Sequence, residues 1–453
     1  MVILAHPNFR SIILFFVVLL LCNLASSQPV GKFPDYKVRV KEPTICDGAV
    51  KQHSGYFDID DKKHFFFWAF ESRNKPLEDP VVLWLHGGPG CSALNALFFE
   101  LGPCKVNKGG NSTSENSNSW NSNATIIFLD QPDDAGFSYG EGVSDTASAA
   151  FDIYVFTQIF FTQFSQYANL SFHIAGVSYG GHYIPTLASL IMKYNNDNSN
   201  AMKLTNINLK SILIGNGLVN PLLQFVHFPD MACPLLDPLS CNQMKNNTQQ
   251  CSDLTQTCYN TKNAKDCVFA KTDCFNTLIE PIEDASLNIL DLRQQCSGIL
   301  CYPDFGDIAI YLSRDDVRNA LGVDPSVAFQ LCSININNNF IMSGDWMLPF
   351  DGFIPSLLNS NIRTLVYAGD KDYLCNWIGN KAWTKALVWS GSQGFNNAND
   401  SAWITNNGNH SGDVTTFGVL SFLRVFDAGH MVPHDKPAES LDFFNKWIFN
   451  KHL

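Results

Sequence analysis

The sequence predicts an α/β fold in which a mostly parallel central sheet is interrupted by a disulfide-rich insertion. Two observations lead to this prediction. Short apolar runs of about five residues alternate with helical sequence through most of the 453-residue chain, which is the pattern of parallel strands buried on both faces. Between residues 218 and 312 the apolar runs become scarce and cysteines gather, as in a subdomain that is held together by disulfides.

The N-terminal segment, residues 1–27, is predicted to be a secretory signal. Arg10 provides a positive charge, residues 12–21 form an apolar core, and the small side chains of Ala25 and Ser27 suit a cleavage site. A signal anchor is the alternative, but the apolar core is short for a membrane span. We therefore expect the chain to enter the secretory pathway and to reach either a vacuole-like or lysosome-like compartment or the extracellular space.

The charge balance restricts the partners of the chain. The 42 Asp and Glu residues outnumber the 30 Lys and Arg residues, which gives a net charge of −12. Such a surface argues against nucleic acid and anionic membranes as partners. No other stretch approaches the length of a membrane span, so no stable membrane insertion is expected after signal cleavage. No metal and no cofactor are expected.

Cysteine usage indicates an oxidising compartment. The chain has 14 cysteines, and an odd number remains when Cys22 leaves with the signal. A zinc site is the competing interpretation, but the spacings are irregular and no pair of histidines accompanies them. We therefore expect disulfides and one free thiol. Glycosylation sequons, which also fit the secretory pathway, occur at Asn111, Asn123, Asn169, Asn246, Asn399 and Asn409.

The insertion divides the predicted core into residues 28–217 and residues 313–453. The predicted core strands cover residues 64–70, 81–85, 125–129, 171–175, 211–214, 364–368 and 422–426. Helical sequence fills about residues 146–166. The polar residues 28–50 are expected to lead into the first strand, and the Asn/Ser-rich residues 110–124 to form a surface loop.

A candidate nucleophile follows the strand at 171–175. Ser178 stands between Gly176 and Gly180 in a Gly-x-Ser-x-Gly pattern, and helical sequence follows at 181–191. A sharp strand-to-helix turn of this kind leaves no room for β-carbons and lifts the serine hydroxyl above the sheet. The pattern by itself is weak, because an ordinary turn serine can produce it. Whether the pattern indicates a catalytic serine therefore depends on finding the other residues of such a site elsewhere in the chain.

A glycine pair after the strand at 81–85 is the first such partner. Gly87 and Gly88 follow His86 directly, and glycines at this point allow the backbone amides to approach a ligand. In α/β-hydrolases this loop supplies one oxyanion donor and the amide after the nucleophile supplies the other. The plain alternative is a tight Gly-Pro loop.

A candidate acid and a candidate base follow two later strands. Asp372 comes just after residues 364–368, and His430 comes just after residues 422–426. The order Ser…Asp…His is that of the α/β-hydrolases, in which the histidine is the general base and the carboxylate orients its ring. Asp370 is a rival for the acid, two residues earlier and on the opposite side of the continued strand.

Several stretches together resemble the serine carboxypeptidase family (peptidase S10), in the pattern of the yeast vacuolar carboxypeptidase Y type, from about residue 51 to the C-terminus. They are HFFFWAFESRN, WLHGGPGCS, FFELGP, SWNSNATIIFLDQP, SYGGHYIP, VYAGDKDYLCNWIGNKAW and RVFDAGHMVP. The resemblance implies an α/β-hydrolase fold with an insertion over the active site. It also implies removal of C-terminal residues from peptides or proteins at acidic pH, with peptide C-termini as the substrate.

The resemblance also assigns roles to individual residues. It implies Ser178, Asp372 and His430 as the catalytic triad and the amides of Gly88 and Tyr179 as the oxyanion hole. It places His86, Gly87, Glu100, Cys375 and Met431 at the substrate and makes Cys375 the free thiol. The implied disulfides are Cys91–Cys332, Cys233–Cys241, Cys251–Cys274, Cys258–Cys267 and Cys296–Cys301. The two cysteines left over, Cys46 and Cys104, are expected to pair with each other.

The chain departs from the family at the expected site for the terminal carboxylate. Val177 stands where the family usually has Glu, and His86 where it usually has Asn. Glu100 matches the acid that normally shares a proton with the missing Glu. His86 is either a neutral loop histidine or an imidazolium that binds the substrate carboxylate at low pH. Because of these departures, an acyltransferase or esterase on the same scaffold is the alternative function.

Overall fold

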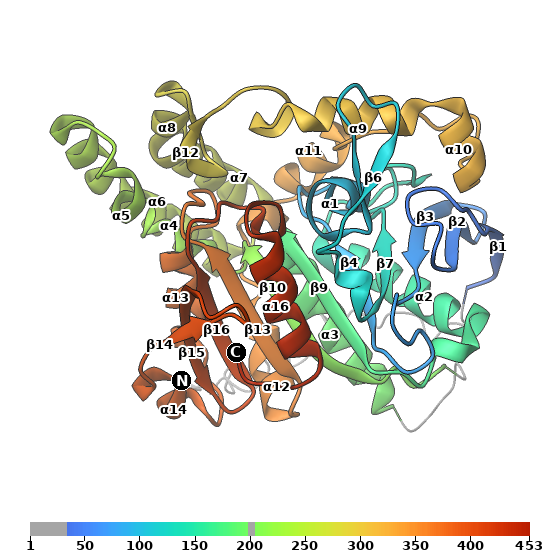
Figure 1. The fold of residues 1–453 in the computed structure, drawn as a ribbon. Helices are drawn as coiled ribbons and strands as arrows, with labels where there is room; N and C mark the ends of the chain where they lie inside the picture. The colour runs from blue at the N-terminus through green and yellow to red at the C-terminus, as the bar shows by residue number, and fades with distance from the viewer. Residues whose placement is uncertain (1–33, 198–203) are drawn as a thin grey trace, which may run out of the picture.

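The computed structural model describes residues 34–197 and 204–453, so the predicted signal at 1–27 lies outside the described residues. A twelve-stranded sheet forms the centre of the described part (Figure 1). Across the sheet the strands follow in the order β1 (Tyr36–Lys41), β2 (Gln52–Ile59), β3 (Lys63–Phe70), β7 (Thr125–Leu129), β4 (Val81–Leu85), β9 (Phe172–Ser178), β10 (Leu209–Gly217), β13 (Arg363–Gly369), β16 (Leu420–Val425), β15 (His410–Phe417) and β14 (Ser401–Ile404), and β8 (Tyr139–Gly140) pairs with β3.

The central strands from β7 to β16 run parallel to one another, whereas the strands outside them pair antiparallel. The prediction of a mostly parallel sheet is therefore confirmed for its centre. The edge strands β1, β2, β14 and β15 were not predicted. Their sequences are more polar or shorter, so a long apolar run does not mark them.

Helices cover both faces of this sheet. One face carries α2 (Thr146–Gln163), α3 (Gly180–Asn195), α12 (Ile354–Asn359) and α13 (Trp377–Ala386), and the other carries α1 (Ala93–Ala96), the following π-helical turn (Leu97–Leu101) and α16 (Pro437–Ile448). The sequence of strand β4 is apolar throughout because both of its faces are buried. Val81, Leu83 and Leu85 point into one hydrophobic core, and Val82 and Trp84 point into the other.

The cysteine-rich segment is mainly helical. It contains α4 (Pro221–Phe225), α5 (Phe228–Ala232), α6 (Pro238–Thr261), α7 (Ala264–Cys274), α8 (Glu280–Asp284), the hairpin of β11 (Leu287–Asn288) and β12 (Asp291–Gln295), and α9 (Asp304–Ser313). These elements lie along the upper side of Figure 1, followed by α10 (Asp315–Leu321) and α11 (Ile334–Met342). The division of the chain at residues 218 and 312 stays a prediction.

Six disulfides are present among the described residues. They join Cys46 to Cys104, Cys91 to Cys332, Cys233 to Cys241, Cys251 to Cys274, Cys258 to Cys267 and Cys296 to Cys301. These are the pairs that the sequence analysis expected, and Cys375 is the free, buried thiol. Three of the six bridges lie between residues 233 and 274, where they tie α6 to the chain before it and to α7.

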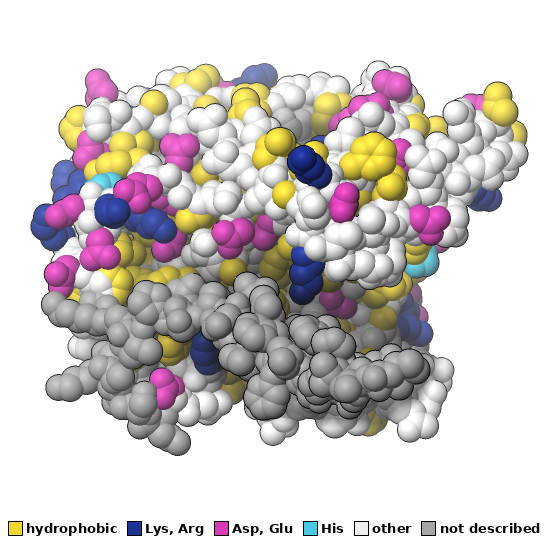
Figure 2. All heavy atoms as spheres, turned by 180° about the vertical axis from the view of Figure 1, so that it is seen from behind, with side chains coloured by type: hydrophobic (Ala, Val, Ile, Leu, Met, Phe, Trp, Pro, Cys, Tyr) yellow, Lys and Arg dark blue, Asp and Glu magenta, His cyan; other side chains and the backbone are white. Residues whose placement is uncertain are grey.

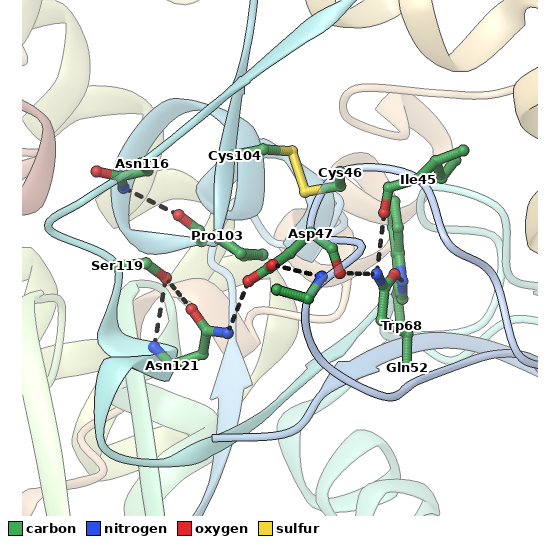
Figure 3. Close-up of a disulfide and its surroundings, with 12 residues drawn as sticks. Ile45, Cys46, Asp47, Gln52, Trp68, Pro103, Cys104, Asn116, Ser119 and Asn121 are labelled. Atoms are coloured by element: carbon green, nitrogen blue, oxygen red, sulfur yellow. Dashed lines mark hydrogen bonds between the residues drawn. A yellow bond between two sulfur atoms is a disulfide. The ribbon is translucent and has the colours of Figure 1, made fainter. Parts of the chain in front are cut away.

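The Asn/Ser-rich stretch 110–124 is not simply a surface loop, and that prediction was wrong for its second half. The stretch includes β6 (Thr113–Glu115), which pairs with β5 (Cys104–Val106), and Trp120 is fully buried, stacked on Phe444 with 4.0 Å between ring centroids. Figure 3 shows Asn121 of this stretch donating to Asp47 beside the Cys46–Cys104 bridge. The second half of this stretch is therefore buried although its sequence is polar, because its side chains form hydrogen bonds with other buried polar side chains.

Charges of both signs are interspersed with apolar and polar side chains on the face seen in Figure 2. Within residues 34–197 and 204–453, no helix combines the length and the apolar character needed to cross a membrane.

Candidate active site

Ser178 ends strand β9 in a backbone conformation that side chains rarely adopt, with a φ of 62°. The neighbouring strand β4 explains the glycines around it. A β-carbon at Gly176 would lie 2.1 Å from the carbonyl oxygen of Leu85, and one at Gly180 would lie 3.0 Å from the same oxygen. The Gly-x-Ser-x-Gly spacing is therefore a packing requirement of this strand-to-helix turn.

Asp372 and His430 meet at the same edge of the sheet. They follow the adjacent strands β13 and β16, and 2.8 Å separates Oδ2 of Asp372 from Nδ1 of His430. Asn216, at the end of β10, donates from Nδ2 to the same carboxylate oxygen at 2.7 Å. All three side chains are buried, so the carboxylate is held in one orientation behind the imidazole.

Asp370, the rival acid, faces away from this pair. Its carboxylate accepts hydrogen bonds from Arg424 Nη2 and from the backbone N–H of Asp427, each at 2.9 Å. Asp370 therefore anchors the loop that follows β16, whereas Asp372 contacts the imidazole.

The loop after β4 packs directly on the candidate nucleophile. A β-carbon on Gly87 would lie 2.6 Å from both Ser178 Cβ and the backbone nitrogen of Tyr179. Gly88, next in the chain, has a φ of 116°, which only glycine adopts readily. The hydrogen bonds of the described residues include His430 with Asp372 but none between Ser178 Oγ and the His430 ring. Such bonds are often long before substrate binds.

His86 lies in the same loop and is buried. Burial, together with the nearby His430, lowers the pKa of His86 to about 3. The imidazole is then neutral throughout the mildly acidic range, and its Nδ1 has no hydrogen-bond partner among the described residues. Of the two interpretations of His86, the structure favours the neutral histidine over the imidazolium.

Glu100 is a buried acid with no charged partner in hydrogen-bond range. Burial, reinforced by Asp435, raises the pKa of Glu100 to about 8. Neither carboxyl oxygen has a hydrogen-bond partner among the described residues, and the same is true of the hydroxyl of the nearby Tyr367. Tyr367 and Val177 both flank Gly215 in the sheet register. The site therefore offers a protonated acid with unused hydrogen-bonding capacity.

Cys375 and Met431 are also buried at this edge. The sulfur of Cys375 and one donor atom each of Asp372 and His430 lie within 4.8 Å of one another. Burial and the negative Asp372 raise the pKa of the Cys375 thiol well above its usual range, so the sulfur is a neutral neighbour of the acid–base pair. Met431 directly follows His430 and precedes α15 (Val432–Asp435).

Sequence reasoning missed two features of the site. The first is Asn216, although the motif Gly215-Asn216-Gly217 at the end of a predicted strand was a usable signal. The second is the hairpin β11–β12, whose turn accepts a hydrogen bond from the backbone N–H of His430 at 2.7 Å. Nothing in the local sequence of this hairpin indicates a contact with the candidate base.

A strained serine on a strand-to-helix turn, with a buried Asp–His pair at the ends of two other parallel strands of the same sheet, defines an α/β-hydrolase. Comparisons with known proteins narrow this class. The family model described as serine carboxypeptidase matches residues 43–450. Carboxypeptidase Y homolog A of Coccidioides posadasii is 46% identical over 435 residues, covering 92% of this chain and 79% of the relative. Carboxypeptidase Y of Candida albicans is 45% identical over 429 residues, covering 92% and 77%.

A solved structure agrees with these sequence matches. The crystal structure of Kex1(delta)p, a prohormone-processing carboxypeptidase from Saccharomyces cerevisiae, superposes with a TM-score of 0.79 at 25% identity, covering 93% of this chain and 97% of that one. The chain belongs to the serine carboxypeptidase family (peptidase S10) and is a hydrolase of that family. The comparisons favour this interpretation over an acyltransferase. Family and disulfides together place it in the secretory pathway.

Proposed function

We propose that the chain releases C-terminal residues from peptides or proteins at acidic pH, through an acyl-enzyme on Ser178. The observation that carries this proposal is the buried hydrogen bond between Asp372 and His430, at the ends of parallel strands in the same sheet whose strand β9 ends in the strained Ser178. A vacuole-like compartment or the extracellular space is the proposed destination. Both lie on the secretory route and are compatible with the disulfides.

In the proposed reaction, His430 takes the proton of Ser178 Oγ while the oxygen attacks the scissile carbonyl carbon. The amides of Gly88 and Tyr179 stabilise the oxyanion, and loss of one such donor typically costs about 3 kcal/mol of transition-state stabilisation. His430 then protonates the departing amine, which is the released amino acid. Water attacks the acyl-enzyme by the reverse sequence and restores Ser178.

Glu100 is proposed to bind the terminal carboxylate of the substrate. A protonated carboxyl donates a hydrogen bond to a carboxylate, whereas an ionised one repels it. Since Val177 cannot share a proton with Glu100, the raised pKa of about 8 depends on burial and would keep Glu100 protonated from acidic pH to near neutrality. The neutral His86 and the backbone of Gly87 complete this proposed subsite.

The test is amino-acid release from a blocked dipeptide, followed across pH, with Ser178→Ala as the inactive control. Release that disappears in Ser178→Ala supports the proposal. Absence of release by the wild type at every pH would reject it.

A second comparison tests the subsite. Glu100→Ala should raise KM for the free-acid dipeptide more than for the corresponding dipeptide amide, and Glu100→Gln, which keeps a donor, should raise it less. Equal changes for the acid and the amide would remove Glu100 from carboxylate recognition.

A further inference from the structure

The hairpin β11–β12 of the cysteine-rich segment touches both catalytic loops. The carbonyl oxygen of Ile289 in its turn accepts the N–H groups of Tyr373 and Leu374, directly after the candidate acid, at 3.1 and 3.0 Å. The next carbonyl, that of Leu290, accepts the N–H of His430 at 2.7 Å. One turn therefore bonds to two loops whose acid and base are 58 residues apart in sequence.

Arg293, on strand β12, extends this contact to the chain around the base. Its Nε and Nη2 form a fork on the fully buried carboxylate of Asp291, at 2.8 and 2.6 Å. The same guanidinium donates from Nη1 to the carbonyl oxygen of Asp427 at 2.7 Å, and from Nη2 to Asp435 at 3.0 Å. The planar fork is suited to holding several acceptors at once.

Asp427 precedes His430 in the chain and Asp435 follows it, so the hydrogen bonds from Arg293 hold the backbone on both sides of His430. Asp435 also accepts the N–H of Gly429 at 2.6 Å, so the backbone immediately before the base is tied to a carboxylate that Arg293 holds. No β-carbon fits at Gly429, because it would lie 2.6 Å from the Leu290 carbonyl oxygen. The base loop is therefore enclosed between the hairpin turn and the Arg293–Asp435 pair.

We propose that Arg293 is a positioning residue that holds the loop 427–430, and through it the His430 ring, at the distance needed for proton transfer. This inference rests on the proposed function of His430 as the base. Arg293 touches no reacting atom, and its effect passes through Asp427, Gly429 and Asp435. A displacement of about 1 Å in a catalytic group can reduce the rate by about a hundredfold.

The chain offers a matched control in Arg314, between α9 and α10. Arg314 also forks on a carboxylate two residues away, that of Asp316, and donates to a distant carbonyl oxygen, that of Asn111, at 2.6 Å. The two guanidinium groups are similarly exposed, at 36% and 34% of the side chain. Only Arg293 contacts the chain around His430.

The experiment compares Arg293→Met, Arg293→Lys and Arg314→Met. The readouts are kcat and KM for the blocked dipeptide and the first-order rate constant for labelling of Ser178 by an organophosphonate at saturation. We expect Arg293→Met to lower kcat and the labelling constant together by about tenfold or more, with KM unchanged. Arg293→Lys should lie between Met and wild type, because an ammonium keeps the charge but has three donors for the four acceptor oxygens that Arg293 contacts. Arg314→Met should stay within about twofold of wild type.

A labelling constant for Arg293→Met equal to that of Arg314→Met would overturn the inference. A first-order constant does not depend on how much of the variant folds, so a loss of stability cannot imitate the expected result. The labelling reaction needs no peptide substrate. It therefore still reports on the position of His430 if the wild type fails to release amino acids, and the two proposals can fail independently.

Discussion

The central sheet and the cysteine-rich segment are stabilised by different interactions. In the sheet, strands such as β4 are buried along their whole length and contribute to two hydrophobic cores. In the cysteine-rich segment, the 24-residue helix α6 buries few side chains, of which three are the disulfide cysteines Cys241, Cys251 and Cys258. One region is held by apolar burial, and the other depends on covalent links.

The difference shows that stability and catalytic geometry have separate sources in this chain. The sheet places the proposed nucleophile, acid and base at the ends of β9, β13 and β16, of which β13 and β16 are adjacent and β10 separates β9 from β13. The cysteine-rich segment supplies the hairpin turn that bonds to Tyr373 and His430. Changes in the sheet edge should therefore alter chemistry directly, whereas changes in α6 and α7 should alter local stability first.

The largest expected effect concerns the two carboxylates at the end of β13. Asp372→Asn should reduce kcat by about 10⁴-fold, the scale found when the acid of such a triad is replaced. Asp370→Asn, which leaves the imidazole contact intact, should reduce it by less than about tenfold. Steady-state kinetics on the blocked dipeptide check both values. A larger loss for the Asp370 variant would reverse the assignment of the acid.

Removal of the Cys251–Cys274 bridge tests the dependence of the cysteine-rich segment on covalent links. The double substitution Cys251→Ala and Cys274→Ala should lower the local free energy of unfolding by about 3 kcal/mol. Hydrogen exchange followed by mass spectrometry should show faster exchange in α6 and α7, with β9 and β10 unchanged. Uniform acceleration over the whole chain would mean that the two regions unfold as one unit.

Replacement of Glu100, a buried acid of the core, should change the pH dependence of folding stability, whereas replacement of an exposed acid of the cysteine-rich segment should not. The unfolded chain ionises Glu100 above its ordinary pKa of 4.5, whereas the folded chain keeps it protonated up to about 8. The folded state thus binds the extra proton in this window, and stability falls as pH rises from 4.5 to 8, by at most about 1.4 kcal/mol per pH unit.

Glu100→Gln should flatten this part of the stability profile, measured by denaturant unfolding at several pH values. Glu283→Gln, at an exposed position of α8, is the matched control and should leave the slope as in the wild type. An unchanged slope in the Glu100 variant would show that the folded state ionises this carboxyl.

The smallest effect concerns glycosylation in the two regions. Asn246 on α6 is exposed, whereas Asn123 is half-buried and donates from Nδ2 to Asn445 at 3.2 Å. We expect glycan on Asn246 and none on Asn123, because the amide nitrogen that would be modified is already engaged. Peptide mapping by mass spectrometry of the protein expressed through the secretory pathway decides this point. The other four sequons have exposed asparagines.

The sequence by itself determined the features that local pattern encodes. Unbroken apolar runs marked the central strands because both faces of a parallel sheet are covered. Gly176 and Gly180 marked the turn at Ser178, because a β-carbon would clash at Gly176 and would be tightly packed at Gly180. The order of Ser178, Asp372 and His430 indicated the class of site. The edge strands and the buried stretch around Trp120 were not predicted, since a polar sequence does not reveal which neighbouring residues will form its hydrogen bonds.

Only the tertiary structure decided how distant segments meet. It turned Asp370 toward Arg424 and Asp372 toward His430, and it buried His86 and Glu100 so that both are neutral at mildly acidic pH. It also placed the turn at Ile289 and Leu290 against the two loops that contain Asp372 and His430. These outcomes depend on desolvation and on hydrogen bonds between residues far apart in the chain, and no local pattern specifies either.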